Sequence, residues 1–295
     1  MIESALRTHL IEQESLRGYL ATWNGELAVF NQEAPPDTDP KWNGQYGRII
    51  FRVDATEDPE RKLGATLSVD VMCEKGVQDP NVMEPIVRDL IDGYFFTQDS
   101  YTMMAKWQKS NYFVEANEKI FGVTIVFRLL AFPCTETVDP DPVLLLNEWS
   151  EGELSEALGA PVKVIGHNDG ITGAWKPTKD APAIYWRISQ TVKCGWIPDT
   201  YAVIWQDATL QGHIFASDVQ TELVICRVID SILQRKQRLI FEDRSPLFVD
   251  RNIRISTSND PLRTGQISVV GTYGILRHIE TSPIQHITTR EDYHG

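Results

Sequence analysis

The segment Arg48-Ile-Ile-Phe-Arg-Val53 recurs 135 residues later as Ala183-Ile-Tyr-Trp-Arg-Ile188. Both copies are rich in β-branched and aromatic residues, which is typical of a strand. Each copy follows a short apolar run and a loop that carries one Trp, at offsets of 135 and 133 residues: Leu27-Ala-Val-Phe30 and Trp42, then Val162-Lys-Val-Ile165 and Trp175. A fixed order at nearly constant spacing predicts that the chain repeats one structural unit.

Three further elements extend the repeat toward the C-terminus. Leu67, Val69 and Val71 alternate as in a half-buried strand, and at an offset of 134 they match Tyr201, Val203 and Trp205. Helical spacing follows in residues 81–96 (Val82, Ile86, Val87, Leu90, Ile91) and in residues 218–234 (Leu223, Val224, Val228, Ile229). A last strand contains Val123, Ile125, Phe127 and Leu129, matched at an offset of 146 by Val269, Tyr273 and Ile275. Each unit then reads helix, strand, loop, strand, loop, strand, helix, loop, strand, which predicts an α+β module whose small antiparallel or mixed sheet packs against one or two helices.

The predicted organisation is two such modules in tandem. The first covers residues 1–134 and opens with a helix over residues 2–19, whose apolar stripe is Ile2, Leu6, Leu10 and Leu16. Residues 135–150 are rich in Pro, which cannot continue a helix or a central strand, so we expect a linker there. The second module covers residues 151–282 and opens with a shorter helix at 151–158, and a tail of residues 283–295 follows.

Composition and charge narrow the class of protein. The chain has 295 residues, 42% of them hydrophobic and 23% charged, which suits two folded domains. No apolar run approaches the roughly 20 residues of a membrane helix, and the N-terminus shows no pattern of a secretory signal. The net charge of −13 argues against a sequence-independent nucleic-acid binder. Residues 1–149 carry 13 Lys and Arg against 24 Asp and Glu, net −11, whereas residues 150–295 carry 15 against 17, net −2.

Cysteines and histidines do not form a recognisable metal or disulfide pattern. The four cysteines, Cys73, Cys134, Cys194 and Cys226, have no short paired spacing, and we expect them to be reduced and mostly structural. The six histidines are scattered: His9, His167, His213, His278, His286 and His294. Gly166-His-Asn-Asp-Gly170 lacks the Lys-Ser or Lys-Thr of a phosphate-binding loop and reads as a turn-rich loop. We therefore expect no cofactor and no metal.

An enzymatic alternative depends on three residues at one strand end. A metal-dependent nuclease needs clustered carboxylates and a Lys, and Asp70, Glu74 and Lys75 come closest to that set. The spacing is imperfect, and the second module has only Asp207 near the equivalent place. A solvated strand end explains these residues more simply. No Gly-x-Ser-x-Gly elbow or Cys–His pair appears, so we expect no enzyme.

Two loops stand out as contact surfaces. Residues 54–62, with Asp58, Arg61 and Lys62, join two strands of the first module, and residues 189–198, with Lys193 and Trp196, join their counterparts. Aromatic side chains are enriched at protein interfaces. These five residues are the predicted interface, and the alternative is an ordinary hairpin loop with a partly buried Trp.

The order of elements resembles that of the tail-terminator, or tail-completion, proteins of long-tailed bacteriophages. The resemblance lies in an opening helix, a short strand, a Pro-rich loop, a central hairpin, a helix containing Val87-Arg-Asp-Leu-Ile-Asp92, and a last strand ending Arg128-Leu-Leu-Ala-Phe132. It covers the first module and, more loosely, the second. Proteins of that family are commonly single modules that form a six-fold ring, and this chain departs from them by being doubled.

The resemblance implies a structural protein of the virion, assembled in the host cytoplasm. Its implied partners are further copies of itself, the tail tube protein and the head–tail connector protein, with DNA passing the lumen unbound. Three doubled chains would give a pseudo-six-fold ring, and six chains a hexamer. Another head–tail connector or a baseplate ring component is the first alternative, and the metal-dependent nuclease is the second.

Overall fold

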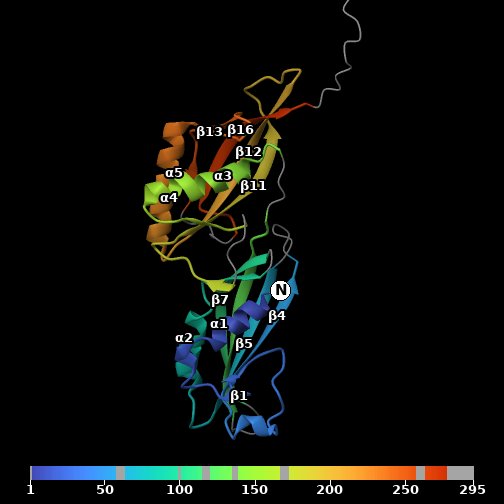
Figure 1. Ribbon diagram of the computed structural model, residues 1–295, viewed down its shortest axis with the longest axis vertical. Coiled ribbons are helices and arrows are strands. Elements are labelled where there is room, and N and C mark those ends of the chain that lie inside the picture. Colours follow the sequence, from blue (N-terminus) through green and yellow to red (C-terminus); the bar gives the residue numbers. More distant parts are fainter. Residues whose placement is uncertain are drawn as a thin grey trace, which may run out of the picture.

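The computed structural model describes residues 2–57, 64–98, 101–114, 120–134, 139–166, 173–256 and 263–277. Within these residues, two modules lie end to end along the long axis, and each has a curled sheet with helices on one face (Figure 1). The predicted α+β class with two modules is confirmed. In this part of the chain, every helix is too short or too polar to traverse a lipid bilayer. The predicted tail, residues 283–295, lies outside the described residues.

The first module contains two α-helices, short 3-10 turns and the strands of its sheet. In chain order its elements are α1 (Glu3–Ile11), a 3-10 turn (Glu14–Leu16), β1 (Thr22–Trp23), β2 (Glu26–Leu27), β3 (Val29–Asn31), a 3-10 turn (Pro40–Trp42), β4 (Arg48–Thr56), β5 (Gly64–Glu74), α2 (Pro80–Asp89), β6 (Phe95–Gln98), β7 (Tyr101–Val114) and β8 (Ile120–Ala131). β1 and β2 form a separate small hairpin.

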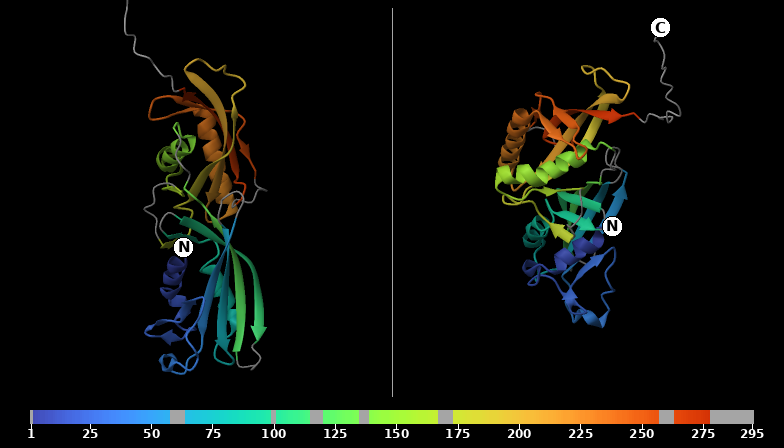
Figure 2. Two further views of the ribbon diagram at one scale, coloured as in Figure 1. Left: turned by 90° about the vertical axis from the view of Figure 1, so that its right-hand side faces the viewer. Right: turned by 45° about the horizontal axis from the view of Figure 1, so that its top comes forward.

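The second module repeats this series with changes in length. Its elements are α3 (Pro142–Trp149), a π-helical turn (Ser150–Leu154), α4 (Ser155–Leu158), β9 (Lys163–Val164), β10 (Gly173–Trp175), β11 (Ala183–Lys193), β12 (Val203–Phe215), α5 (Val219–Lys236), β13 (Arg238–Ile240), β14 (Pro246–Val249), β15 (Arg254–Ile255) and β16 (Ile267–Leu276). Two perpendicular views show the same end-to-end arrangement (Figure 2).

Both sheets have the same strand order. The first runs β3-β4-β5-β8-β7-β6 and the second β9-β11-β12-β16-β14-β13, with β15 also pairing with β16. In each sheet, the first pair of strands is parallel, and the other pairs are antiparallel. The repeat inferred from spacing is therefore also a repeat of topology.

The register of the third strand differs from the prediction. Val53 lies opposite Leu67, and Ile188 lies opposite Leu210, so the counterpart of Leu67 is Leu210 and not Tyr201. Because side chains alternate between faces, an odd error in register exchanges the two faces of a strand. Trp205, predicted on the core face, therefore lies on the face opposite the buried Leu210.

The predicted match between the last strands of the two modules is also wrong in register. Phe127 lies opposite Leu67, and Val269 lies opposite Leu210, so Phe127 corresponds to Val269 and not to Tyr273. The β11–β12 hairpin has a longer loop than β4–β5 and contains an irregularity in its register. Alternating apolar patterns do not reveal such an insertion, because they match at many offsets.

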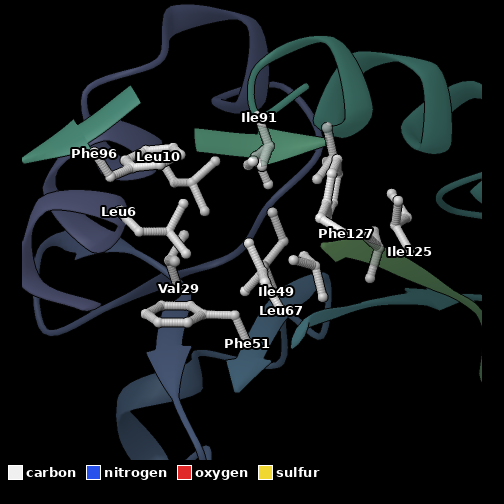
Figure 3. Packing of buried hydrophobic residues seen from close by; sticks show 14 of the residues in the cluster. Leu6, Leu10, Val29, Ile49, Phe51, Leu67, Ile91, Phe96, Ile125 and Phe127 are labelled. Atoms are coloured by element: carbon white, nitrogen blue, oxygen red, sulfur yellow. The ribbon is translucent and has the colours of Figure 1, made fainter. Parts of the chain in front are cut away.

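The core of the first module lies between its sheet and its helices. The predicted stripe, Ile2, Leu6, Leu10 and Leu16, is fully buried. Figure 3 shows Leu6 and Leu10 beside Phe96, with strand residues gathered against them. Amphipathic spacing thus identified the buried residues correctly, but the helix ends at Ile11 and not at residue 19, and Leu16 lies in the 3-10 turn that follows.

The segment assigned as a linker contains the first helix of the second module. α3 starts at Pro142, and the Asp141 carboxylate caps it by accepting hydrogen bonds from first-turn amides. Pro is tolerated at the first helical position because its missing N–H has no partner there. Leu146 and Trp149 lie in the second core, and the helical region continues through the π-helical turn into α4. It is longer than the sequence predicted.

Strands β6 and β7, with their counterparts β13 and β14, were not predicted. α2 ends at Asp89, and Gly93, with a φ of 78°, precedes β6, so the helix is shorter than the predicted 81–96. Val82 is 43% exposed, while Met83 of α2 is buried. The long β7 carries polar residues, which conceal its strand character.

Candidate interaction surfaces

A strand from the second module joins the sheet of the first. β10, in the loop between β9 and β11, pairs with the outer edge of β6, and Trp175 lies opposite Phe95. In the first module, the corresponding loop stays on its own sheet, where it forms the 3-10 turn that buries Trp42. The same loop of the repeat therefore takes two different positions, and one of them ties the modules together.

Large aromatic side chains fill the junction between the modules. The buried residues are Phe95, Leu130 and Phe132 from the first module and Ile165, Ala183, Tyr185 and Phe215 from the second. The Phe95 and Trp175 rings stack at 4.5 Å, and Phe132 contacts Tyr185 at 5.2 Å and Phe215 at 5.4 Å between ring centres. Burying each such ring stabilises the folded chain by about 1.5–3 kcal/mol. The junction is a continuous core between the two modules.

Polar contacts fix the same junction. The Tyr185 hydroxyl donates to the Pro133 carbonyl at 3.1 Å, and Lys176 Nζ donates to the Asp92 carbonyl at 2.9 Å. Gly166 has a φ of 76°, and a Cβ there would lie 3.1 Å from the Tyr185 ring. The two hydrogen bonds cross from one module to the other, and a Cβ at Gly166 would also lie 3.2 Å from the Pro133 carbonyl oxygen of the first module.

A cavity of about 560 Å³ opens beside this junction. Its charged lining comes from both modules and consists of Asp92, Lys106, Arg128, Lys176, Asp218 and Glu222. Lys106 Nζ lies 3.2 Å from the Asp92 carboxylate. The three basic and three acidic groups balance, so the charged lining has no surplus of either sign.

The acidic side of this cavity is organised by the start of α5. The Asp218 carboxylate accepts hydrogen bonds from the hydroxyl of Ser217 at 2.7 Å and from the amide and hydroxyl of Thr221 at 2.9 and 2.8 Å. These donors favour the ionised form and lower the Asp218 pKa to about 2. Burial instead raises the pKa of Glu222, one turn into the helix.

A second surface lies at the far end of the second module. Trp196 is 65% exposed in the β11–β12 loop, and its ring centre lies 6.4 Å from that of Phe248. Trp205 contacts the same Phe248 ring at 6.1 Å. Tyr201 and Leu276 are also strongly exposed near this end. The structure thus places the predicted Trp196 among other exposed apolar side chains.

The charged residues of the predicted interface divide into two groups. Lys193 is exposed and lies 2.7 Å from the Asp199 carboxylate, and its hydrogen bond is the main cause that lowers the pKa of Asp199. Asp58, Arg61 and Lys62 lie outside the described residues. Lys193 and Trp196 are therefore brought together on the one β11–β12 hairpin.

At the end of the first module where β1 lies in Figure 1, half-buried and buried aromatic side chains surround a buried cation; Trp42 and Arg48 are each 3% exposed. We call these side chains the base cluster: Trp23, Phe30, Trp42, Tyr46 and Arg48. The Arg48 guanidinium lies 3.9 Å from the Trp42 ring centre and 4.1 Å from that of Tyr46, and it pairs with Asp37 at 2.7 Å. Its side chain is only 4% exposed. Stacking and ion pairing compensate this buried charge.

Of the three residues of the nuclease alternative, Asp70 and Lys75 make contacts with β8, and Glu74 is the last residue of β5. The Thr124 hydroxyl donates to Asp70 at 2.5 Å, and Lys75 Nζ lies 5.2 Å from the Phe121 ring centre. Asp207 makes the same type of contact with the Thr272 hydroxyl in the second sheet. Among the described residues, no group of three His, Cys, Asp or Glu side chains could hold a metal ion.

The histidines and cysteines within the described ranges occupy structural positions. His9 Nε2 lies 2.8 Å from the Leu90 carbonyl, and the buried His213 receives a hydrogen bond from Arg187 at 3.1 Å. Burial lowers the pKa of His9. Burial also raises the pKa of Cys73 to about 11 and that of Cys226 to about 12, which disfavours their thiolates, while Cys194 is buried and Cys134 exposed. His167, His278, His286 and His294 lie outside the described residues.

The junction was not predicted from the sequence. Trp175 matches Trp42 in the repeat, but Gly173-Ala-Trp175 stands where the first module has Pro40-Lys-Trp42. Pro cannot donate to a strand ladder, so this difference was a signal that only the second loop could add a strand. No pattern marks Phe95, Phe132 or Phe215 as contacts between modules.

No protein-family model matches the chain, and no curated protein is significantly similar to it. Its function is therefore inferred from the surfaces of the molecule and from the resemblance in element order.

Proposed function

We propose that the chain is a structural protein of a long-tailed bacteriophage virion, forming a ring that terminates the tail tube and joins it to the head connector. The observation that supports this most is that two modules with the same strand order are joined through a buried apolar junction. Such a pair supplies two quasi-equivalent positions in a closed ring. The element order that resembles tail terminators supplies the assignment to the tail.

The doubled chain favours a ring of three chains. Three pairs of modules would present six similar units to a six-fold tail tube, with half the number of chains. A hexamer of the full chain would present twelve units. The mass of the assembled ring distinguishes these two states directly.

The charge of the first half suits a channel for DNA. Residues 1–149 carry a net charge of −11, and carboxylates along a channel wall repel the phosphates of a passing duplex. The second half, at −2, is nearly neutral and better suited to contacts with protein partners. The lumen of a three-chain ring would then alternate between strongly and weakly acidic sectors.

Negative-stain imaging of the purified protein, together with its mass in solution, tests the proposal. A ring that co-purifies with the tail tube protein supports a terminator. Binding solely to the portal ring or to baseplate proteins would assign the chain to another connector ring. DNA cleavage that requires a divalent metal and is abolished in Asp70→Ala would refute the structural role in favour of a nuclease.

A further inference from the structure

The sheet edge that β10 occupies in the first module has a counterpart in the second. Phe95 on β6 lies opposite Met104, and Arg238 on β13 lies opposite Phe248, so Arg238 takes the place of Phe95. In the described part of the chain, β13 is the outermost strand at this side of its sheet. The second module therefore leaves open the edge that the first module uses to bind a neighbouring module.

The backbone of β13 is arranged to accept such a neighbour. Hydrogen bonds on either side of it join Val249 to Gln237 and Phe241 to Ser245, each at 3.0 Å. Bonded and non-bonded pairs alternate in an antiparallel ladder, so the peptide groups of Arg238 and Ile240 face outward. Open strand edges of this kind recruit further chain segments.

Aromatic side chains lie beside this edge, the exposed Trp196 and the half-buried Phe248. We define the tip surface as Trp196, Arg238, Ile240 and Phe248. Ile240 is 50% exposed, and Trp196 and Phe248 border a hollow of about 470 Å³. At the internal junction, Phe95, the counterpart of Arg238, is fully buried, and Met104, the counterpart of Phe248, is half-buried.

Charge at the two ends of the molecule is complementary. Residues 235–251, around the tip surface, carry five exposed Lys and Arg against three Asp and Glu, net +2. Residues 32–48, which include the loop over the base cluster and Arg48, carry three acidic residues against one Lys and one Arg, net −1, and Asp37 is paired with Arg48 within the molecule. Opposite charges favour contact between the two ends of different molecules and disfavour contact between like ends.

We infer that the tip surface binds the base cluster of a second copy of this chain, so that chains join head to tail. In the second module, the loop that contains β10 lies on the β6 edge of the first module. The base cluster lies at the corresponding end of the first module. Pro40 takes the place of Gly173, so the contact between chains depends more on side chains than on a full strand ladder. This inference rests on the proposed ring and names the contact that would close it.

Complementary variants of the full chain test the direction of the contact. The tip variant, Arg238→Glu with Ile240→Pro, reverses one charge and removes an outward N–H. The base variant, Glu33→Lys with Thr38→Lys, reverses the charge of the loop. The matched control, Val224→Ser with Arg227→Glu, makes similar changes on the exposed face of α5. Trp196→Ser is a second tip variant that leaves the strand unaltered.

The molecular mass of each variant is measured in solution, and only variants that keep the wild-type melting temperature are compared. Wild type and control are expected to form the multimer, whereas each tip or base variant alone stays at 33.5 kDa. An equal mixture of tip and base variants should form complexes of two chains and no larger species, because one intact tip meets one intact base. Multimers of the tip variants as large as wild type would overturn this contact and leave the ring standing. A wild-type chain that stays at 33.5 kDa would overturn both.

Discussion

Phe95→Ala should uncouple the two modules. Its side chain is fully buried, and its ring centre lies 4.5 Å from Trp175, 5.1 Å from Phe215 and 5.5 Å from Phe132. Truncating a buried Phe to Ala costs about 3–5 kcal/mol, through lost burial and the cavity left behind. Because two of these partners belong to the second module, most of that loss falls on the contact between modules and not on either core.

The expected observation is a change in the shape of the unfolding curve as well as its midpoint. Urea denaturation of the wild type, followed by tryptophan fluorescence and far-ultraviolet circular dichroism, should give coincident single transitions, because the junction couples the modules. In Phe95→Ala the two probes should separate into two transitions. The matched control is Phe51→Ala, which empties a fully buried site in the first core without touching the junction.

Phe51→Ala should lower stability by a similar amount, about 3–5 kcal/mol. In this control, the unfolding transitions of the two modules should be only weakly separated, because the junction is intact. The reasoning is refuted if Phe95→Ala costs less than about 1 kcal/mol, well below the expected range. It is equally refuted if Phe95→Ala keeps coincident transitions while Phe51→Ala splits them.

Three further outcomes are expected. Ser150→Ala should lower stability by about 1–3 kcal/mol in thermal melts, because the buried Trp186 indole N–H donates to that hydroxyl at 3.0 Å and would lose its acceptor. The Asp218 pKa is about 2 against an ordinary value of 3.8, so the stability that its ionised carboxylate contributes is present above about pH 4 and is lost as pH falls through 2. Asp218→Asn should flatten the dependence of the melting temperature on pH over that window, and an unchanged dependence would contradict the capping role. A thiol reagent at pH 8 should modify the exposed Cys134 before the buried Cys73, whose pKa is raised to about 11, and the reverse order by mass spectrometry would contradict that assignment.

The repeat, the α+β class and the buried face of the first helix could all be predicted from the amino-acid sequence. Paired strand segments such as residues 48–53 and 183–188 occupy equivalent places in two sheets of the same order. The stripe at Leu6 and Leu10 is buried as its spacing indicated. These features depend on local periodicity, which each segment carries without reference to the rest of the chain.

The strand register, the strands β6, β7, β13 and β14 and the junction depend on contacts between distant segments and could not be predicted from local patterns. An alternating pattern fits several offsets, so it could not show that Leu67 corresponds to Leu210. The three residues of β10 are too few to have a period, and they become a strand only because β6 offers an open edge. Of the candidate interface, the sequence indicated the exposed Trp196, whereas the aromatic packing around Phe95 depends on contacts between segments far apart in the chain.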